Sequence, residues 1–400
     1  MAIEPIVNEE AQSLRQHISQ NRILSGPYGS VLDDVDLIKF NSGHTNWRLA
    51  FGDDSGRKLL EGTAKDYARV LEDGDFLALP TFGLAYSRIK ELGDNIIKKL
   101  TDPNAEDAAK FRAKLQEIDV PELERLIHDL TGFSDDEINS LVVKFNNDAV
   151  RIGKEALQSS QAVGKNLKLV APIAPYGDCY SGKGFTTIDD AVKRHLEQTN
   201  LLKDHVDLFL FETNCTVEQA IAASIAGEKS GKPYIISFVV DKDGYLRGNN
   251  GKVTVADAIK KVNRVLYQRK IQQSGLVTYG INCSSEYGTI SALTQLAQER
   301  KIENVRLVYL NASPDDQCVN EAKAHGHRNQ TAEEFAASSG EVKRISEFVT
   351  VFSGCCGIKP DYLPVLRDYI KGNSQAVEGS PGTATASVSM HEVKERVGAL

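Results

Sequence analysis

Short runs of apolar residues recur along the chain, and amphipathic stretches separate most of them. The runs are continuously apolar rather than alternating, which is typical of parallel strands that are buried on both faces. This pattern predicts eight strands, at residues 22–26, 76–82, 167–173, 206–212, 234–240, 276–282, 305–311 and 348–354.

The stretches between these runs show helical periodicity. One of them, TVEQAIAASIAGEKSG, opens with the capping-box residues Thr216 and Gln219 and ends at Gly231. Eight strands that alternate with helices predict an α/β fold, namely a (β/α)₈ TIM barrel. An open, doubly wound sheet is the alternative that the same alternation allows.

Two regions do not follow the alternation. Residues from about 92 to 164 are charged and helical in pattern and contain no convincing strand, so we predict a helical insertion between the second and third strands. Residues 372–400 are mostly small and polar, which predicts a flexible C-terminal tail. The sequence thus predicts one barrel domain over residues 1–371, followed by that tail.

Composition narrows the classes of partner. The chain of 400 residues is 41% hydrophobic and 26% charged, as in ordinary soluble proteins, and its net charge of −8 argues against a nucleic-acid or an anionic-membrane partner. The apolar runs are much shorter than the about 20 residues of a spanning helix, and the N-terminus lacks the pattern of a secretory signal. We therefore expect a cytoplasmic protein.

The cysteines are the first candidates for chemistry. Six of them are too few for a disulfide scaffold in a chain of this length, and a reducing compartment would keep them as thiols. A cluster among them therefore indicates metal binding or catalysis.

In a TIM barrel the chemistry lies at the C-terminal ends of the strands. Three cysteines are predicted to lie there, namely Cys283 after the sixth strand and the pair Cys355–Cys356 after the eighth. Gly354 and Gly357 flank the pair, and glycine tolerates a positive φ, so both thiols could turn toward Cys283. Three thiolates and one open position are typical of a catalytic zinc site.

Two other interpretations of these cysteines stay open. A free cysteine is often a small buried hydrophobe, and a pair of adjacent thiols could serve redox chemistry. The remaining cysteines have no comparable arrangement, so we expect them to be incidental: Cys179, Cys215 and Cys318.

Glu212 ends the fourth apolar run. Because Thr216 already offers a cap to the next helix, we expect the carboxylate of Glu212 to bind an ammonium group or to act as an acid or base. Histidines in predicted loops have no evident partner and are interpreted as loop residues: His44, His325 and His327.

A zinc ion with three thiolate ligands suits one kind of reaction. A thiol that enters the open position loses its proton, whereas a free thiol has a pKa of about 8.5 and is mostly protonated at neutral pH. The anionic ligands keep the bound thiolate electron-rich, which favours alkyl transfer to sulfur.

The motifs around these cysteines resemble a known family. GINCSS (280–285) and GCCGIKPDYL (354–363) are similar to the paired cysteine motifs of the homocysteine S-methyltransferase family. Three further segments match in the same order: SGPYGSVL (25–32), APYGDCYSG (174–182) and FETNCTVEQA (211–220). The resemblance extends from about Arg22 to Ile370.

The resemblance implies a TIM barrel in which Cys283, Cys355 and Cys356 bind Zn²⁺ and the thiol of homocysteine takes the fourth position. It also implies that Glu212 holds the ammonium group of this substrate and that the backbone near Gly26 holds its carboxylate. Two more residues at predicted strand ends, Thr81 and Asn282, complete the expected substrate-binding site.

The implied partners are a small thiol amino acid and a methyl donor. In stand-alone members the donor is a sulfonium or betaine-type compound, and we expect S-methylmethionine or S-adenosylmethionine, with methionine as the product. No cobalamin or folate module follows the barrel in this sequence.

The sequence departs from the family pattern at two predicted strand ends. Ser25-Gly26 stands where the family has Asp-Gly, and Leu79-Pro80-Thr81 stands where it has Thr-Asn-Thr. The first change removes a carboxylate from the amino-acid pocket. Other functions therefore stay open, namely methyl transfer to another small thiol or to a selenol amino acid, and a non-catalytic, zinc-binding regulatory barrel.

Overall fold

The computed structural model describes most of the barrel. The described residues are 8–28, 54–84, 134–249, 252–312 and 330–372, together with the single positions 98, 102 and 104.

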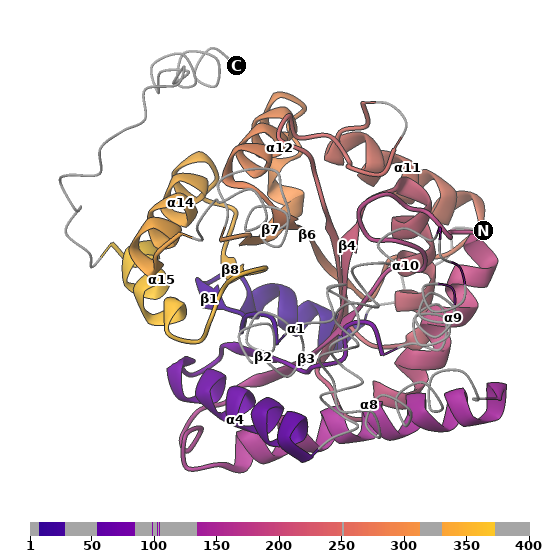
Figure 1. Cartoon of the computed structure of the whole chain (residues 1–400). Coiled ribbons are helices and arrows are strands. Elements are labelled where there is room, and N and C mark those ends of the chain that lie inside the picture. The colour runs from indigo at the N-terminus through magenta and orange to yellow at the C-terminus, as the bar shows by residue number, and fades with distance from the viewer. Residues whose placement is uncertain are drawn as a thin grey trace.

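Eight parallel strands surround a common axis, and helices form a ring outside them (Figure 1). The strands are β1 (Arg22–Ile23), β2 (Phe76–Ala78), β3 (Lys168–Ile173), β4 (Leu208–Asn214), β5 (Tyr234–Phe238), β6 (Leu276–Ser284), β7 (Val305–Leu310) and β8 (Val351–Gly354). Each strand lies within or overlaps a predicted apolar run. The predicted (β/α)₈ barrel is confirmed, and the open, doubly wound alternative is wrong.

The helices follow the strands in the order that the alternation predicts. They are α1 (Glu9–His17), α4 (Asp54–Val70), α8 (Asp135–Gln158), α9 (Ile188–Leu202), α10 (Val217–Ser230), α11 (Val255–Gln268), α12 (Glu286–Gln298), α14 (Ala332–Ile345) and α15 (Tyr362–Ile370), with a short 3₁₀ helix, η2 (Ile302–Asn304). The predicted capping box of α10 is present at Thr216 and Gln219, and Gly231 ends the helix in a left-handed conformation.

Two hydrophobic cores explain why the strands are apolar throughout. The inner core fills the barrel, and α1 contributes Ala11 and Leu14 to it, followed by its C-cap residue Ile18. The outer core lies between the sheet and the ring of helices. Since each strand faces one core on either side, an alternating pattern would have placed polar side chains in one of them.

The barrel closes between β1 and β2 with a single bridge, from Leu24 to Phe76. Side chains supply the hydrogen bonds that a longer ladder would have made. The Ala78 N–H donates to the hydroxyl of Ser25 at 2.8 Å, and the Ile23 N–H donates to the carboxylate of Asp75 at 2.8 Å. Ser25, which departs from the family pattern, therefore helps to close the sheet.

The predicted insertion is described only in its second part. That part contains α8, which begins with a capping box at Ser134 and packs Val142, Phe145 and Ala149 into the outer core. This helix is the member of the outer ring between β2 and β3. The rest of the predicted insertion lies outside the described residues apart from the isolated positions, and the tail beyond Gly372 lies outside them altogether, so both stay predictions.

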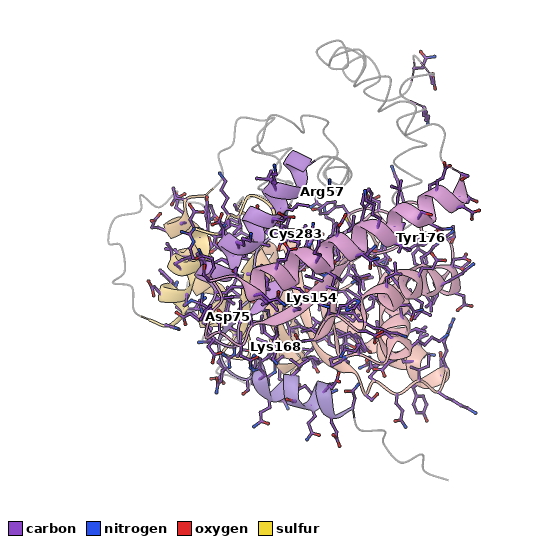
Figure 2. All side chains as sticks on the ribbon, turned by 90° about the horizontal axis from the view of Figure 1, so that it is seen from below. Arg57, Asp75, Lys154, Lys168, Tyr176 and Cys283 are labelled. Carbon is purple, nitrogen blue, oxygen red and sulfur yellow. A yellow bond between two sulfur atoms is a disulfide. The ribbon has the colours of Figure 1, made fainter. Side chains whose placement is uncertain are left out.

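The two ends of the barrel are separated in the side view. Figure 2 places Cys283 toward one end, and Asp75 and Lys168 toward the end where α1 lies. We call the end at the C-terminal ends of the strands the mouth, and the opposite end the base. Within the described ranges, no helix combines the length and the apolar character that crossing a bilayer requires.

Candidate metal and acceptor site

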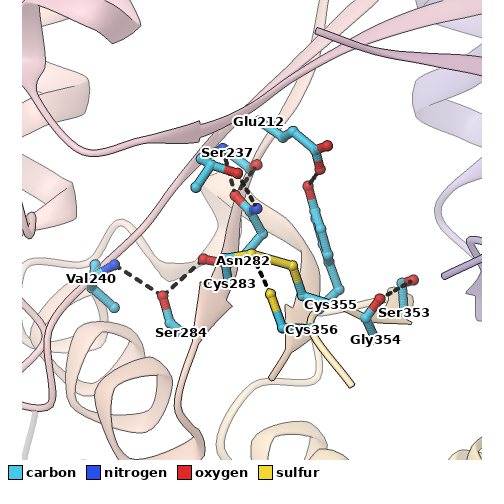
Figure 3. Close-up of a disulfide and its surroundings, with 12 residues drawn as sticks. Glu212, Ser237, Val240, Asn282, Cys283, Ser284, Ser353, Gly354, Cys355 and Cys356 are labelled. Atoms are coloured by element: carbon cyan, nitrogen blue, oxygen red, sulfur yellow. Dashed lines mark hydrogen bonds between the residues drawn. A yellow bond between two sulfur atoms is a disulfide. The ribbon is translucent and has the colours of Figure 1, made fainter. Parts of the chain in front are cut away.

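Three thiols converge at the mouth, as the sequence predicts. The sulfur atoms of Cys283, Cys355 and Cys356 all lie within 4.8 Å of one another, although 72 residues separate the first two in the chain. Cys283 and Cys355 are joined by a disulfide, and the sulfur of Cys356 lies 4.0 Å from that of Cys283 (Figure 3). Among the described residues, this is the one group of three or more such side chains placed to hold a metal ion.

The disulfide does not join the adjacent pair that the redox interpretation uses. Consecutive Cα atoms are about 3.8 Å apart, below the about 4.4 Å at which the usual range for disulfides begins. The Cα atoms of Cys283 and Cys355 are 5.4 Å apart, well inside that range. The pairing across two strands therefore follows from the same convergence that would build a metal site.

Cys283 reaches the mouth through a backbone irregularity. It adopts a left-handed conformation with φ of 49°, and the register between β6 and β7 shifts between Asn282 and Ser284. In a regular strand Asn282 and Cys283 would point to opposite faces, but a bulge of this kind redirects one side chain. The sequence shows no glycine at this turn, so the predicted strand end gave no sign of it.

The two glycines around the cysteine pair have different tasks. Gly357 has a φ of 85° and makes the predicted turn. Gly354 has no positive φ, so this part of the prediction is wrong; instead, a β-carbon at Gly354 would collide with the side chain of Ile358. Ile358 is fully buried, and the close approach lets the chain fold back under the thiols.

The two serines of the GINCSS motif fix the end of β6. The hydroxyl of Ser284 accepts a hydrogen bond from the Val240 N–H and donates one to the carbonyl of Asn282, both at 2.9 Å. Ser285 caps α12 by accepting from the Gly288 N–H at 3.2 Å. The motif therefore holds the strand on both sides of Cys283.

Glu212 lies on β4, half-buried in the mouth. Its partner within the described residues is Tyr309 of β7, whose phenol donates a hydrogen bond to the carboxylate. Burial raises the pKa of Glu212 to about 7, and the hydrogen bond from Tyr309 opposes this rise. Glu212 is thus poised between its neutral and charged forms near neutral pH.

Sequence reasoning missed Tyr309. Its side chain belongs to the inner core together with Leu307, two residues earlier on β7. Because side chains of a strand point alternately inward and outward, Tyr309 could have been predicted to point into the barrel near the end of β7.

Asn282 is fully buried, and its amide makes three hydrogen bonds to protein groups. Its Oδ1 accepts from the Thr213 N–H at 2.8 Å and from the Ser237 hydroxyl at 2.6 Å, and its Nδ2 donates to the Thr213 hydroxyl at 2.8 Å. The structure therefore places the amide between the strands, behind the surface of the mouth (Figure 3).

Thr81 and Gly26 lie at the ends of β2 and β1, as predicted, and both are buried. The Thr81 hydroxyl donates to the carbonyl of Pro172 at 2.8 Å. A β-carbon on Gly26 would lie 2.6 Å from the hydroxyl of Tyr67, so only glycine fits this position. The contacts of Thr81 and Gly26 with a substrate stay predictions.

The loop after β3 is fastened to the start of α10. The side-chain amide of Gln219 donates to the carbonyls of Tyr176 and Asp178, both at 3.1 Å.

Cys215 is buried beneath this loop, and burial raises its pKa to about 12, so it stays a thiol. Cys179 is also buried and is not part of a disulfide. The remaining candidates lie outside the described residues: His44, Cys318, His325 and His327.

The thiol cluster has the donor atoms of a soft-metal site. Sulfur ligands about 2.3 Å from a tetrahedral zinc ion are about 3.8 Å apart. The sulfurs of Cys283 and Cys356 are already 4.0 Å apart, whereas the disulfide holds those of Cys283 and Cys355 closer than a metal site requires. Reduction of the disulfide would free all three sulfurs as ligands, with one position left for a substrate. The residues present therefore fit a zinc ion.

These features together define a class, namely a TIM barrel with a thiol-rich metal-binding cluster and a carboxylate at its mouth. A sequence model described as homocysteine S-methyltransferase matches residues 128–370, more than half of the chain. The chain belongs to the homocysteine S-methyltransferase family, as the motifs indicate.

Solved structures agree with the fold. Two crystal structures of the homocysteine methyltransferase MmuM from Escherichia coli, in an oxidised and a metallated form, match with a TM-score of 0.58 at 15% sequence identity. These matches cover 90% of this chain and 98% and 99% of the other two. The apo form matches with a TM-score of 0.51 over 88% of this chain and 96% of its own. No curated protein matches the chain.

Proposed function

We propose that the protein transfers a methyl group from a sulfonium donor to the thiol of homocysteine and thereby produces methionine. Membership of the homocysteine S-methyltransferase family supports this proposal. The observation that carries it is the convergence of Cys283, Cys355 and Cys356 at the mouth that also holds Glu212. A methyl group that leaves a positively charged sulfur releases a neutral thioether, which makes a sulfonium compound a suitable donor to a thiolate.

The three cysteines would hold a zinc ion in their reduced form. This metal suits the ligand set, since thiolates are soft donors and three protein ligands leave a fourth position for a substrate. When bound, the ion would supply the negatively charged form of the acceptor thiol at neutral pH.

Glu212 would anchor the ammonium group of the acceptor. A cation beside the carboxylate favours its charged form, so the binding of the acceptor would lower the pKa that burial raises. The hydrogen bond from Tyr309 fixes one carboxylate oxygen, which leaves the other for the substrate. Gly26 and Thr81 would border the acceptor carboxylate, Gly26 through its backbone.

Orientation would then supply much of the rate. The acceptor would be held at two points, its ammonium group at Glu212 and its sulfur at the cysteine cluster, so that the thiolate faces the methyl group of the donor. A bound geometry in which nucleophile, carbon and leaving group lie in line avoids much of the entropic cost of the encounter.

A methyl-transfer assay tests this proposal. Reduced, zinc-loaded protein is incubated with homocysteine and with a panel of sulfonium and betaine donors, and the zinc content is measured on the same sample. We expect methionine with S-methylmethionine or S-adenosylmethionine. Selenohomocysteine and other small thiols in the panel test the breadth of the acceptor site. A zinc-loaded protein that binds no homocysteine in calorimetry and releases no proton would instead support the regulatory barrel.

A further inference from the structure

Two buried residues of the mouth have a backbone conformation that their residue types rarely adopt. Thr213 and Cys283 have φ of 63° and 49°, and a left-handed conformation is a genuine outlier for a β-branched residue such as threonine. The other non-glycine residues with positive φ in the described ranges, Lys270 and Arg300, are exposed and follow helices. Buried strain of this kind persists only where the surroundings impose it.

Both strained residues are close to the proposed site: Thr213 is adjacent to one of its residues, and Cys283 is one of them. Thr213 directly follows Glu212, in the segment of β4 where the register with β5 shifts. Cys283 is itself a proposed metal ligand, at the corresponding irregularity of β6. The conformation of these two residues therefore decides where the carboxylate and the thiol point.

Asn282 connects the two irregularities. Its amide holds Thr213 from both sides, because the Thr213 N–H donates to Oδ1 and the Thr213 hydroxyl accepts from Nδ2. Through the backbone, Asn282 leads directly into Cys283. The fully buried side chain of Asn282 therefore links β6 directly to Ser237 of β5 and to Thr213 of β4.

Hydrogen bonds support the carboxylate and its neighbour from three strands. Glu212 accepts from Tyr309, the Ser237 hydroxyl donates to Asn282, and the Asn282 amide is bonded to Thr213, the residue after Glu212. Such a network fixes the direction of a side chain that has few direct partners.

We propose that Asn282 is a positioning residue, which holds Thr213 in its left-handed conformation and thereby aims Glu212 at the acceptor beside Cys283. This role replaces the direct substrate contact that the sequence predicts for Asn282. The inference rests on the proposed function, since it assigns to Glu212 the task of anchoring the acceptor.

The test is a rescue experiment on reduced, zinc-loaded protein. Asn282→Ala should raise the KM for homocysteine by roughly 10- to 100-fold, as the loss of a supporting residue usually does, while kcat falls much less and the zinc content stays at one ion per chain. Thr213→Gly in the same background should restore most of the KM, because glycine adopts a left-handed conformation without help.

Thr278→Val is the matched control. It removes hydrogen bonds of the same strand at its base end, to the carbonyls of Tyr279 and Asn304, but none that reaches β4, so we expect an unchanged KM. Should Asn282→Ala not fold, Asn282→Asp replaces it, since aspartate keeps the size and removes the donor to Thr213. A KM that Thr213→Gly fails to restore overturns the inference, because a direct substrate contact cannot be rescued from β4.

A second readout separates this inference from the proposed function. Wild-type protein that binds no homocysteine would refute the proposed function, and wild type, Asn282→Ala, Thr213→Gly and the double variant are then compared by urea unfolding. If Asn282 holds Thr213, the glycine should offset part of the destabilisation from Asn282→Ala. Strictly additive effects of the two substitutions would overturn the inference independently of any activity.

Discussion

Two tyrosine–glutamate pairs lie at opposite ends of the barrel, and they differ in how many partners the carboxylate has. At the base, Glu228 accepts hydrogen bonds from the Tyr234 phenol and the Gly275 N–H, both at 2.9 Å, and from the Ser274 hydroxyl at 3.0 Å. At the mouth, Glu212 has Tyr309 as its described partner. Both glutamates are half-buried, so the difference lies in their partners rather than in their burial.

A second carboxylate at the base, that of Asp75, is also fully paired. Asp75 accepts from the backbone N–H groups of Ile23 and Glu72, both at 2.8 Å, and its carboxylate lies 2.7 Å from the guanidinium of Arg367. By contrast, the mouth holds an incompletely paired carboxylate, and two residues with a strained backbone. The comparison indicates that the paired groups of the base stabilise the fold, whereas the arrangement at the mouth is less stable and would serve substrate binding. This division is expected of a TIM barrel.

The largest effect should come from the thiol cluster. Cys283→Ser should abolish zinc binding and methyl transfer together. Loss of an outer-shell partner already lowers metal affinity or activity by roughly 10- to 100-fold, and loss of a ligand should lower them further. Zinc content and activity are measured on one sample. Cys179→Ala, which removes a buried thiol outside the cluster, should keep both. A fully active, zinc-free Cys283→Ser protein would contradict the proposed mechanism.

The next effect tests the base. Asp75→Asn removes the buried carboxylate beside the guanidinium of Arg367 and leaves it only the exposed carboxylate of Glu72, which should lower the free energy of unfolding by about 3 kcal/mol. Glu72→Gln changes the exposed partner of the same arginine and should cost less than about 1 kcal/mol. Both variants are followed by urea denaturation. If Asp75→Asn changed the KM for homocysteine more than the stability, the division between base and mouth would fail.

Much of this division could be predicted from the sequence. The strands were predictable because apolar runs that face two cores need no long-range information. The thiol cluster and Glu212 were predictable because barrel topology brings strand ends together, whatever their separation in sequence.

The conformations of Thr213 and Cys283 could not be predicted in this way. Thr213 is held by the amide of Asn282, which is 69 residues away in the chain, and Cys283 lies where the register between β6 and β7 shifts. Neither threonine nor cysteine is a residue type that is typical of a left-handed turn. The role of Ser25 in closing the sheet could not be predicted either. It depends on the Ala78 N–H, which lacks a ladder partner only because the barrel closes at that point.

A matched pair of substitutions compares the two glutamates directly. Glu212→Gln should raise the KM for homocysteine by about 10- to 100-fold, since it removes a charged partner of the ammonium group. The free energy of unfolding should stay equal or rise, because a buried carboxylate disappears. Glu228→Gln should show the reverse, with an unchanged KM and a loss of about 1 kcal/mol from a weakened hydrogen bond. Equal effects of both on the KM would refute the comparison.

The smallest effect is a shift in pH dependence. Burial raises the pKa of Glu212 to about 7 and the Tyr309 hydrogen bond lowers it, so kcat/KM for homocysteine should fall as the pH drops below about 7, where the carboxylate becomes neutral. Tyr309→Phe removes the group that favours the charged form. The acidic limb of the profile should therefore move to higher pH, by up to about one unit. Tyr234→Phe, at the base, should leave the limb in place, and a shift to lower pH in Tyr309→Phe would show that the phenol does not stabilise the carboxylate.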